Sequence, residues 1–140
     1  MKAESAIFVE QATIILARAQ IMLRAGLNED AARAAYMAGF HVAQAYIFER
    51  TDKTSKSHKG VQIEFFRLTK DDPRIDVELR KFLSQSYDYK SVADYFTGPD
   101  ASTSAEEATN ALATSRRFVT HVSELVTIPP PPPDGLHSLP

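Results

Sequence analysis

Apolar side chains recur at three- and four-residue spacing along most of the chain, the pattern of helices that bury one face. The first such segment, residues 5–25, ends before Gly26, which adopts the left-handed conformation of a helix end without steric cost. A second begins at Asn28, the expected N-cap, and runs to about Arg50. Its apolar face is rich in alanine and includes Gly39, which predicts close contact with another helix.

Two further helical segments follow, each ended by residues that stop a helix. A short apolar helix begins near Gly60 and ends before Pro73, whose ring cannot be accommodated in a helix interior. Residues 75–96 predict another helix with one apolar face. Residues 97–103 then form a break of turn-forming residues.

The last helix has the clearest start signal. Ser104 and Glu107 have the spacing of a capping box, and the apolar face that follows continues to Val126. No segment alternates apolar and polar residues as a half-buried strand would. The sequence therefore predicts an all-α fold, an up-and-down helical bundle of four long helices plus one short helix.

The C-terminal segment differs in composition from the rest of the chain. Residues 128–140 contain five consecutive prolines, which cannot form a helix. We expect this segment to be a disordered, proline-rich tail. The predicted domain organisation is one helical bundle over residues 4–127, followed by the tail over residues 128–140.

Composition narrows the classes of function. A chain of 140 residues is long enough for one core, and its net charge of −2 means that any nucleic-acid site must be a local basic patch. The absence of cysteine excludes disulfides, thiolate metal sites and cysteine nucleophiles. We find neither a signal peptide nor an uninterrupted apolar run long enough for a bilayer, so we expect a soluble cytoplasmic protein without membrane association.

Three segments carry a family resemblance. They are AARAAYMAGFHVAQAYIFER at 31–50, SHKGV at 57–61 and YDYKSVADYF at 87–96. In this order they resemble the HEPN domain family (higher eukaryotes and prokaryotes nucleotide-binding), closest to its small stand-alone prokaryotic members. The resemblance covers about residues 4–127 and implies a helical bundle, a homodimer, and association with nucleotides or RNA. It also implies a toxin or antitoxin component, with an antitoxin or nucleotidyltransferase as partner.

The sequence departs from the ribonuclease members of that family. Those members carry an arginine followed, after four to six residues, by a histidine. Lys90 stands where the family has its arginine, and no histidine follows at that spacing. Lysine lacks the planar fork that grips phosphate with two hydrogen bonds, which argues against RNA cleavage by this route.

A literal match to the arginine–histidine spacing occurs in RRFVTH, within the segment that resembles the closing helix of the family. Its two residues, Arg116 and His121, are the candidates for catalysis. Five residues of helix correspond to a rotation of about 500°, so their side chains should point about 140° apart on one helix. Cooperation of the two residues across a dimer remains open.

A polar loop precedes the short third helix. Four side chains in it are candidates for binding a nucleotide or RNA: Lys53, Lys56, His58 and Lys59. Free N–H groups and the helix dipole attract anions to a helix N-terminus, and Gly60 would allow close backbone approach. The alternative is a solvated loop in which Ser57 is simply the N-cap of the helix.

A second group of candidates lies in the YDYKSVADYF segment: Lys90, Asp94 and Tyr95. Lys90 and Asp94 have the spacing of an ion pair within one helix. They form either a structural pair or part of a polar cleft that positions a nucleotide or a partner. The histidines show no metal-ligand spacing, so we expect no metal and no cofactor.

These observations leave three functions open. The first is a non-enzymatic HEPN-type binding protein of a toxin–antitoxin or nucleotidyltransferase-linked system, which binds nucleotide, RNA or a partner protein. The second is a metal-independent endoribonuclease toxin of the same fold. The third is a helical adaptor whose proline tail binds an aromatic groove in a partner.

Overall fold

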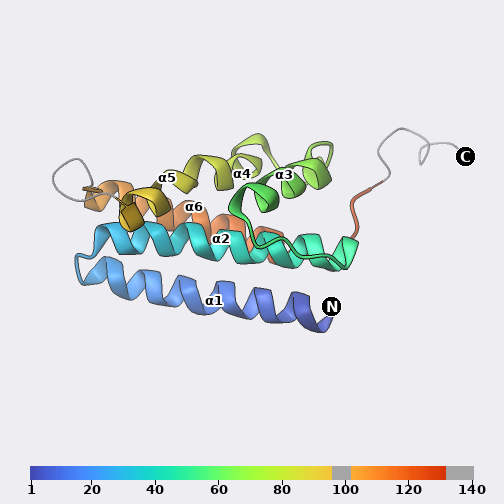
Figure 1. The fold of residues 1–140 in the computed structure, drawn as a ribbon, viewed down its shortest axis with the longest axis horizontal. Coiled ribbons are helices and arrows are strands. Elements are labelled where there is room, and N and C mark those ends of the chain that lie inside the picture. The colour runs from blue at the N-terminus through green and yellow to red at the C-terminus, as the bar shows by residue number, and fades with distance from the viewer. Residues whose placement is uncertain (96–101, 132–140) are drawn as a thin grey trace, which may run out of the picture.

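The computed structural model describes residues 1–95 and 102–131, and their regular structure is helical throughout (Figure 1). Six helices occur in this part of the chain: α1 Ala3–Arg24, α2 Asn28–Thr51, α3 His58–Thr69, α4 Val77–Arg80, α5 Phe82–Tyr95 and α6 Ala105–Leu125. No strand is found among the described residues. The predicted all-α fold class is therefore confirmed.

The central element is α2. It packs against α1, α3, α5 and α6, and Figure 1 shows α1 along one side of it and α3, α4 and α5 on the other. Because α2 has neighbours on several sides, it buries residues around most of its circumference, which explains its many alanines. By contrast, α1 buries one narrow stripe, formed by Ser5, Ala12 and Ala19.

The predicted layout of four long helices and one short helix is not confirmed. Three helices have 21 to 24 residues, whereas α5 has 14, α3 has 12 and α4 has four. The segment predicted as one helix over residues 75–96 is divided at Lys81, a turn residue. Asp76 caps the short α4, because its side chain accepts a hydrogen bond from the Leu79 N–H at 2.8 Å.

The helix ends follow the sequence signals with one exception. The Ser57 side chain accepts from the Gly60 N–H, and Ser104 and Glu107 form the predicted capping box. The N-cap prediction for Asn28 is wrong: Leu27 occupies that position without a side-chain cap, and Asn28 is the first helical residue. The turn after α1 is so short that the Leu27 N–H still bonds to the Met22 carbonyl, which leaves the cap to an apolar residue.

Close helix contact at Gly39 is confirmed. A Cβ added there would lie 3.1 Å from Cδ2 of Phe82 and closer still to Cε2. The Phe82 ring in turn stacks on Phe118 of α6, with ring centroids 4.8 Å apart. Gly39 therefore lets α2, α5 and α6 meet at one point in the core.

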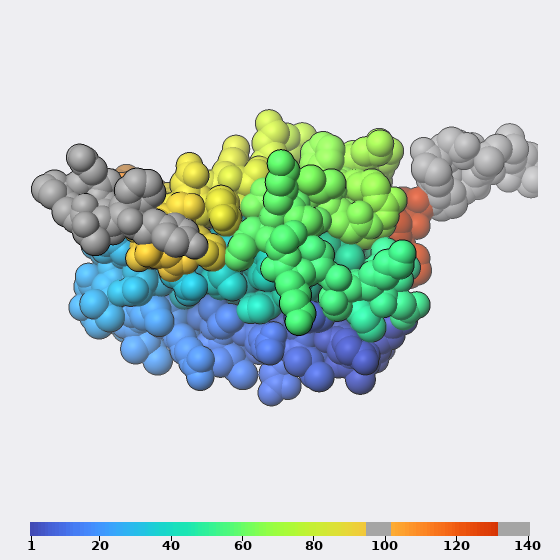
Figure 2. Space-filling view, viewed as in Figure 1, coloured from blue at the N-terminus to red at the C-terminus, as the bar shows by residue number. Residues whose placement is uncertain are grey.

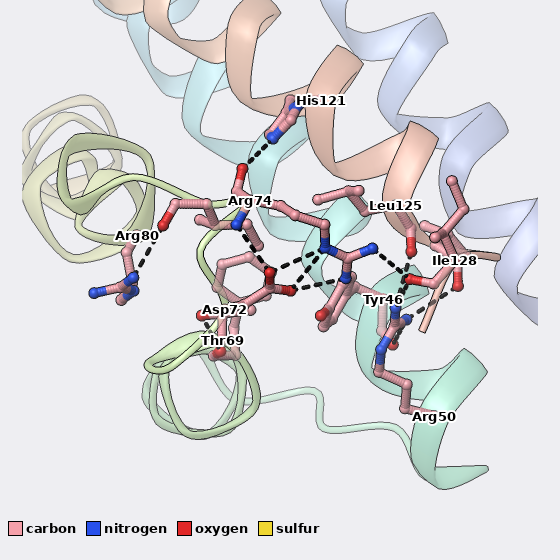
Figure 3. Close-up of polar contacts among 12 residues, drawn as sticks. Tyr46, Arg50, Thr69, Asp72, Arg74, Arg80, His121, Leu125 and Ile128 are labelled. Carbon is pink, nitrogen blue, oxygen red and sulfur yellow. Dashed lines mark hydrogen bonds and ion pairs between the residues drawn. The ribbon is translucent and has the colours of Figure 1, made fainter. Parts of the chain in front are cut away.

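Two arginines hold the end of α6 against the rest of the bundle (Figure 3). The Arg50 guanidinium lies 3.6 Å from the centroid of the Tyr46 ring and donates hydrogen bonds to the carbonyls of Leu125, Val126 and Ile128. Arg74 forms an ion pair with the buried Asp72 at 2.8 Å and also donates to the Ile128 carbonyl. The chain is thus attached to the bundle at Ile128, while residues 132–140 of the predicted tail lie outside the described residues.

Candidate functional site

An open groove of about 690 Å³ lies between α6 and the segment 73–79. We call it the α6 groove. It is lined by Pro73, Arg74, Asp76, Leu79, Arg116, Arg117, Thr120, His121 and Glu124. Three arginines, a histidine and two carboxylates therefore line one surface. Two of the arginines are paired with carboxylates beside the groove, Arg74 with Asp72 and Arg117 with Glu78.

Both residues of the arginine–histidine match line this groove. Although five helical residues separate their directions by about 140°, the groove is open enough for Arg116 and His121 to reach it from the same helix. Arg116 also donates a hydrogen bond to the Gln20 side chain of α1. The structure therefore brings the two catalytic candidates to one surface within a single chain.

His121 also has a structural contact. Its Nε2 donates to the carbonyl oxygen of Arg74 across 2.5 Å, which fixes the orientation of the ring over the segment after α3 (Figure 3). A neutral imidazole that donates through Nε2 keeps Nδ1 as an acceptor. His121 can therefore hold the groove wall and still offer one nitrogen to a ligand.

The arginines of the groove differ in how firmly they are held. Burial acts to raise the pKa of Asp72, but the hydrogen bonds from Arg74 outweigh it and lower that pKa, so the Asp72–Arg74 pair is ionised. Arg117 lies 3.3 Å from Glu78, and both side chains are more than half exposed. Such a surface pair contributes little free energy. Arg116 and Arg117 are therefore the cations best placed to exchange their present partners for a phosphate.

The two groups of binding candidates from the sequence meet at His58. The ring of His58 contacts those of Tyr36, Phe40 and Tyr87, at centroid distances of 5.5, 4.5 and 5.4 Å. The Tyr36 hydroxyl lies 2.8 Å from Nδ1 of His58, and burial raises the pKa of Tyr36 to about 12. This aromatic contact joins the start of α3 to α2 and α5.

The predicted Lys90–Asp94 pair belongs to the same cluster. Asp94 accepts from Lys90 at 2.6 Å and from Nε of Arg33 at 2.7 Å, and these contacts, the Lys90 bond above all, lower its pKa. Burial, followed by the positive charges of Lys90 and Arg33, lowers the pKa of His58. The side chain of Tyr95 lies outside the described residues. We call these side chains the His58 cluster: the polar residues Arg33, His58, Lys90 and Asp94, and the three aromatic neighbours of His58, which are Tyr36, Phe40 and Tyr87.

The three lysines of the preceding loop, which we call the loop lysines, are exposed: Lys53, Lys56 and Lys59. The room expected beside Gly60 is already filled. A Cβ at Gly60 would lie 2.6 Å from the Ser57 hydroxyl oxygen and closer to that of Ser55. The glycine therefore accommodates two serine side chains, and its N–H is bonded to Ser57.

Three cations near these sites were missed by sequence reasoning. Arg117 adjoins Arg116, so this pair of neighbouring arginines was a visible signal. Arg33 stands alone among alanines three residues before Tyr36, a weaker signal. Arg74 gave none, because its place beside α6 depends on the path of the chain after α3.

In the described parts of the chain, no three histidine, aspartate or glutamate side chains lie together in a way that could hold a metal ion. The two sites offer cations and hydrogen-bond donors, and the His58 cluster adds aromatic faces. These groups bind anions and bases. The class of protein that the fold and the groove define is an all-α bundle with exposed arginines on an open surface hollow.

The chain belongs to the HEPN domain family, whose model matches residues 5–125. None of the curated proteins compared with the chain matches it significantly. The HEPN domain suggests a nucleotide- or RNA-related role, or a role associated with toxins.

Proposed function

We propose that this HEPN protein binds single-stranded RNA through the α6 groove and acts by binding rather than by catalysis. The observation that carries the proposal is that two exposed neighbouring arginines, Arg116 and Arg117, line a single open groove together with His121. Arginine grips phosphate with two parallel hydrogen bonds, and exposed cations release counterions from a nucleic acid when they bind it.

The loop lysines and the His58 cluster add a second basic surface. With His58 neutral, the charges of Arg33 and Lys90 exceed that of Asp94, and the loop lysines add three more exposed charges. The tyrosine and histidine rings of the cluster are of the kinds on which bases stack. We expect this second surface to strengthen the binding of RNA or a nucleotide, while the α6 groove determines where the RNA lies.

The setting of the protein is part of the same proposal. Membership of the family supports a role in a toxin–antitoxin or nucleotidyltransferase-linked system, with an antitoxin or nucleotidyltransferase as partner. The protein would act in the cytoplasm as a homodimer and without membrane association. The proline tail would remain available to a partner with an aromatic groove.

Fluorescence anisotropy with a labelled single-stranded RNA tests the proposal. We expect Arg116→Ala/Arg117→Ala to weaken binding at least about tenfold, because two phosphate contacts are lost. Arg67→Ala is the matched control: Arg67 is also an exposed arginine in a surface ion pair, with Glu64, but it lies outside the groove. Equal binding by the parent and the double variant would contradict the proposal.

A metal-independent endoribonuclease is the second candidate, because Arg116 and His121 line one groove. His121 could accept the proton of the attacking RNA 2′-hydroxyl through Nδ1, and arginine could stabilise the negative charge that develops on the phosphoryl oxygens. Incubating RNA with the protein in EDTA, beside His121→Gln and Lys90→Ala, separates the candidates. Cleavage by the parent that His121→Gln abolishes and Lys90→Ala retains would replace the binding function; intact RNA throughout would support it.

A further inference from the structure

The outer face of α1 carries a stripe of exposed isoleucines. Ile7, Ile14 and Ile21 are 54%, 42% and 63% exposed, and their seven-residue spacing aligns them along one side of the helix. The opposite side of α1 packs on α2 through residues of the same spacing. Figure 2 shows α1 in blue along the lower edge of the molecule, with no other element below it. The bundle itself therefore leaves this stripe uncovered.

The exposed pattern is symmetric about Ile14. Ile7 and Ile21 lie equally far from it in the sequence, and so do Met1 and Leu27, which are also exposed apolar residues. Every large exposed apolar side chain of the first 27 residues thus has a counterpart, with Ile14 at the centre.

The charges of α1 follow the same symmetry with opposite sign. Glu4 and Glu10 lie in the first half of the helix, and Arg24 and Arg18 lie at the matching distances in the second half. All four are exposed. A copy of this helix that runs in the opposite direction would place its basic half against the acidic half of the first.

Building on the homodimer of the proposed function, we infer that α1 is the surface through which the two copies dock, in an antiparallel pair with Ile14 beside the two-fold axis. A two-fold interface uses the same patch on both subunits, so the patch must be complementary to itself. The apolar residues and the charges of α1 meet this condition only when the two helices run antiparallel. A parallel pair would set glutamates against glutamates and arginines against arginines.

The size of the surface indicates a reversible dimer. A helix of 22 residues is about 33 Å long. One exposed helix face supplies less than the ~800 Å² per partner of a standard stable interface. The dimer should therefore dissociate on dilution.

A membrane is the other surface that could cover an apolar helix face. Among the described helices, α1 is the one long and apolar enough to cross a bilayer, and 11% of that stretch is buried inside the bundle. A membrane, however, requires no symmetry of the apolar positions and no division of the helix into an acidic and a basic half. The second copy of the chain accounts for both.

Cysteine crosslinking tests the arrangement without background, because the chain has no cysteine. Ile14→Cys should crosslink to its own copy on mild oxidation. Ile7→Cys and Ile21→Cys should each fail to crosslink alone and should crosslink when mixed, because only a disulfide between nearby Cα atoms can form. Self-crosslinking of Ile7→Cys and of Ile21→Cys, or no crosslink at position 14, would overturn the proposal.

Charge reversal provides a second measurement, by light scattering at roughly tens of micromolar protein. Glu4→Lys/Glu10→Lys makes both halves basic and should raise the dissociation constant of the dimer at least tenfold, whereas adding Arg18→Glu/Arg24→Glu should restore it. Ile14→Glu places two carboxylates beside the axis and should yield monomers. A dimeric Ile14→Glu variant, or a monomeric parent that sediments with anionic vesicles, would overturn the proposal.

Discussion

Replacing Gly39 with alanine should destabilise the protein, although alanine is the better helix former. The added methyl group would lie 3.1 Å from Cδ2 of Phe82 and closer to Cε2, inside normal contact distance. The Phe82 ring has nowhere to move, because it is 2% exposed and stacks on the fully buried Phe118. The clash must therefore be relieved by a shift of α5 relative to α2.

Two opposing terms set the magnitude. Glycine-to-alanine replacement within a helix gains about 1 kcal/mol from backbone entropy, whereas overpacking a closed core costs about 1–3 kcal/mol. Because the ring is confined on both sides, we expect the overpacking cost to exceed the gain. The net loss in the free energy of unfolding should be about 1 kcal/mol, or roughly 4 °C in Tm for a chain of this size.

Urea denaturation of the parent, the two single variants and the double variant measures the clash separately from helix propensity. Phe82→Leu removes the ring that the new methyl group would meet, so Gly39→Ala in that background should be neutral or stabilising. The coupling free energy between the two sites should be about 1–3 kcal/mol. If Gly39→Ala stabilises the parent, or has the same effect in both backgrounds, the close contact at Gly39 does not limit the packing of α2.

Three further outcomes are expected. Asp72→Asn should lower the free energy of unfolding at pH 7 by about 1–3 kcal/mol. Because the pKa of Asp72 is lowered in the folded protein, the stabilisation by its carboxylate is present above about pH 4 and is lost in acid. The urea melts of parent and variant should therefore converge as the pH falls. Deleting residues 129–140 keeps the Ile128 oxygen that accepts from Arg50 and Arg74, so circular dichroism should show unchanged helix content and Tm; a large fall in either would show that the prolines stabilise the bundle. Changing the three loop lysines together to alanine should weaken RNA binding and make the slope of log K against log salt concentration less steep by up to about two units. Unchanged binding at matched salt would show that the loop does not contact RNA.

The helices were predictable because their signals are local. The spacing of apolar residues predicts α1, α2 and α6, and the capping box fixes where α6 begins. The division of residues 75–96 at Lys81 was missed, because no glycine or proline marks it; the cap made by Asp76 marks only where α4 begins. The N-cap at Leu27 was missed for a related reason, since the length of the preceding turn selects it rather than side-chain chemistry.

The candidate sites were predictable only where one helix supplies both partners. The Lys90–Asp94 pair follows from a four-residue spacing. Arg33, which completes that cluster, precedes Asp94 by 61 residues, and no pattern in the sequence joins them. The α6 groove could not be predicted either, because Arg74 reaches it from the segment after α3, which is distant from α6 in the sequence. Sites assembled from several elements depend on packing and are not encoded in any short motif.

The most direct test of RNA binding by the α6 groove is the salt dependence of the affinity for a single-stranded RNA. For each phosphate contact, the logarithm of the binding constant falls by about 0.7 for every tenfold rise in salt concentration. Arg116→Ala/Arg117→Ala should therefore give a slope less steep than the parent by about 1.4, while Arg67→Ala should run parallel to the parent. A groove variant whose line runs parallel to that of the parent would contradict the account.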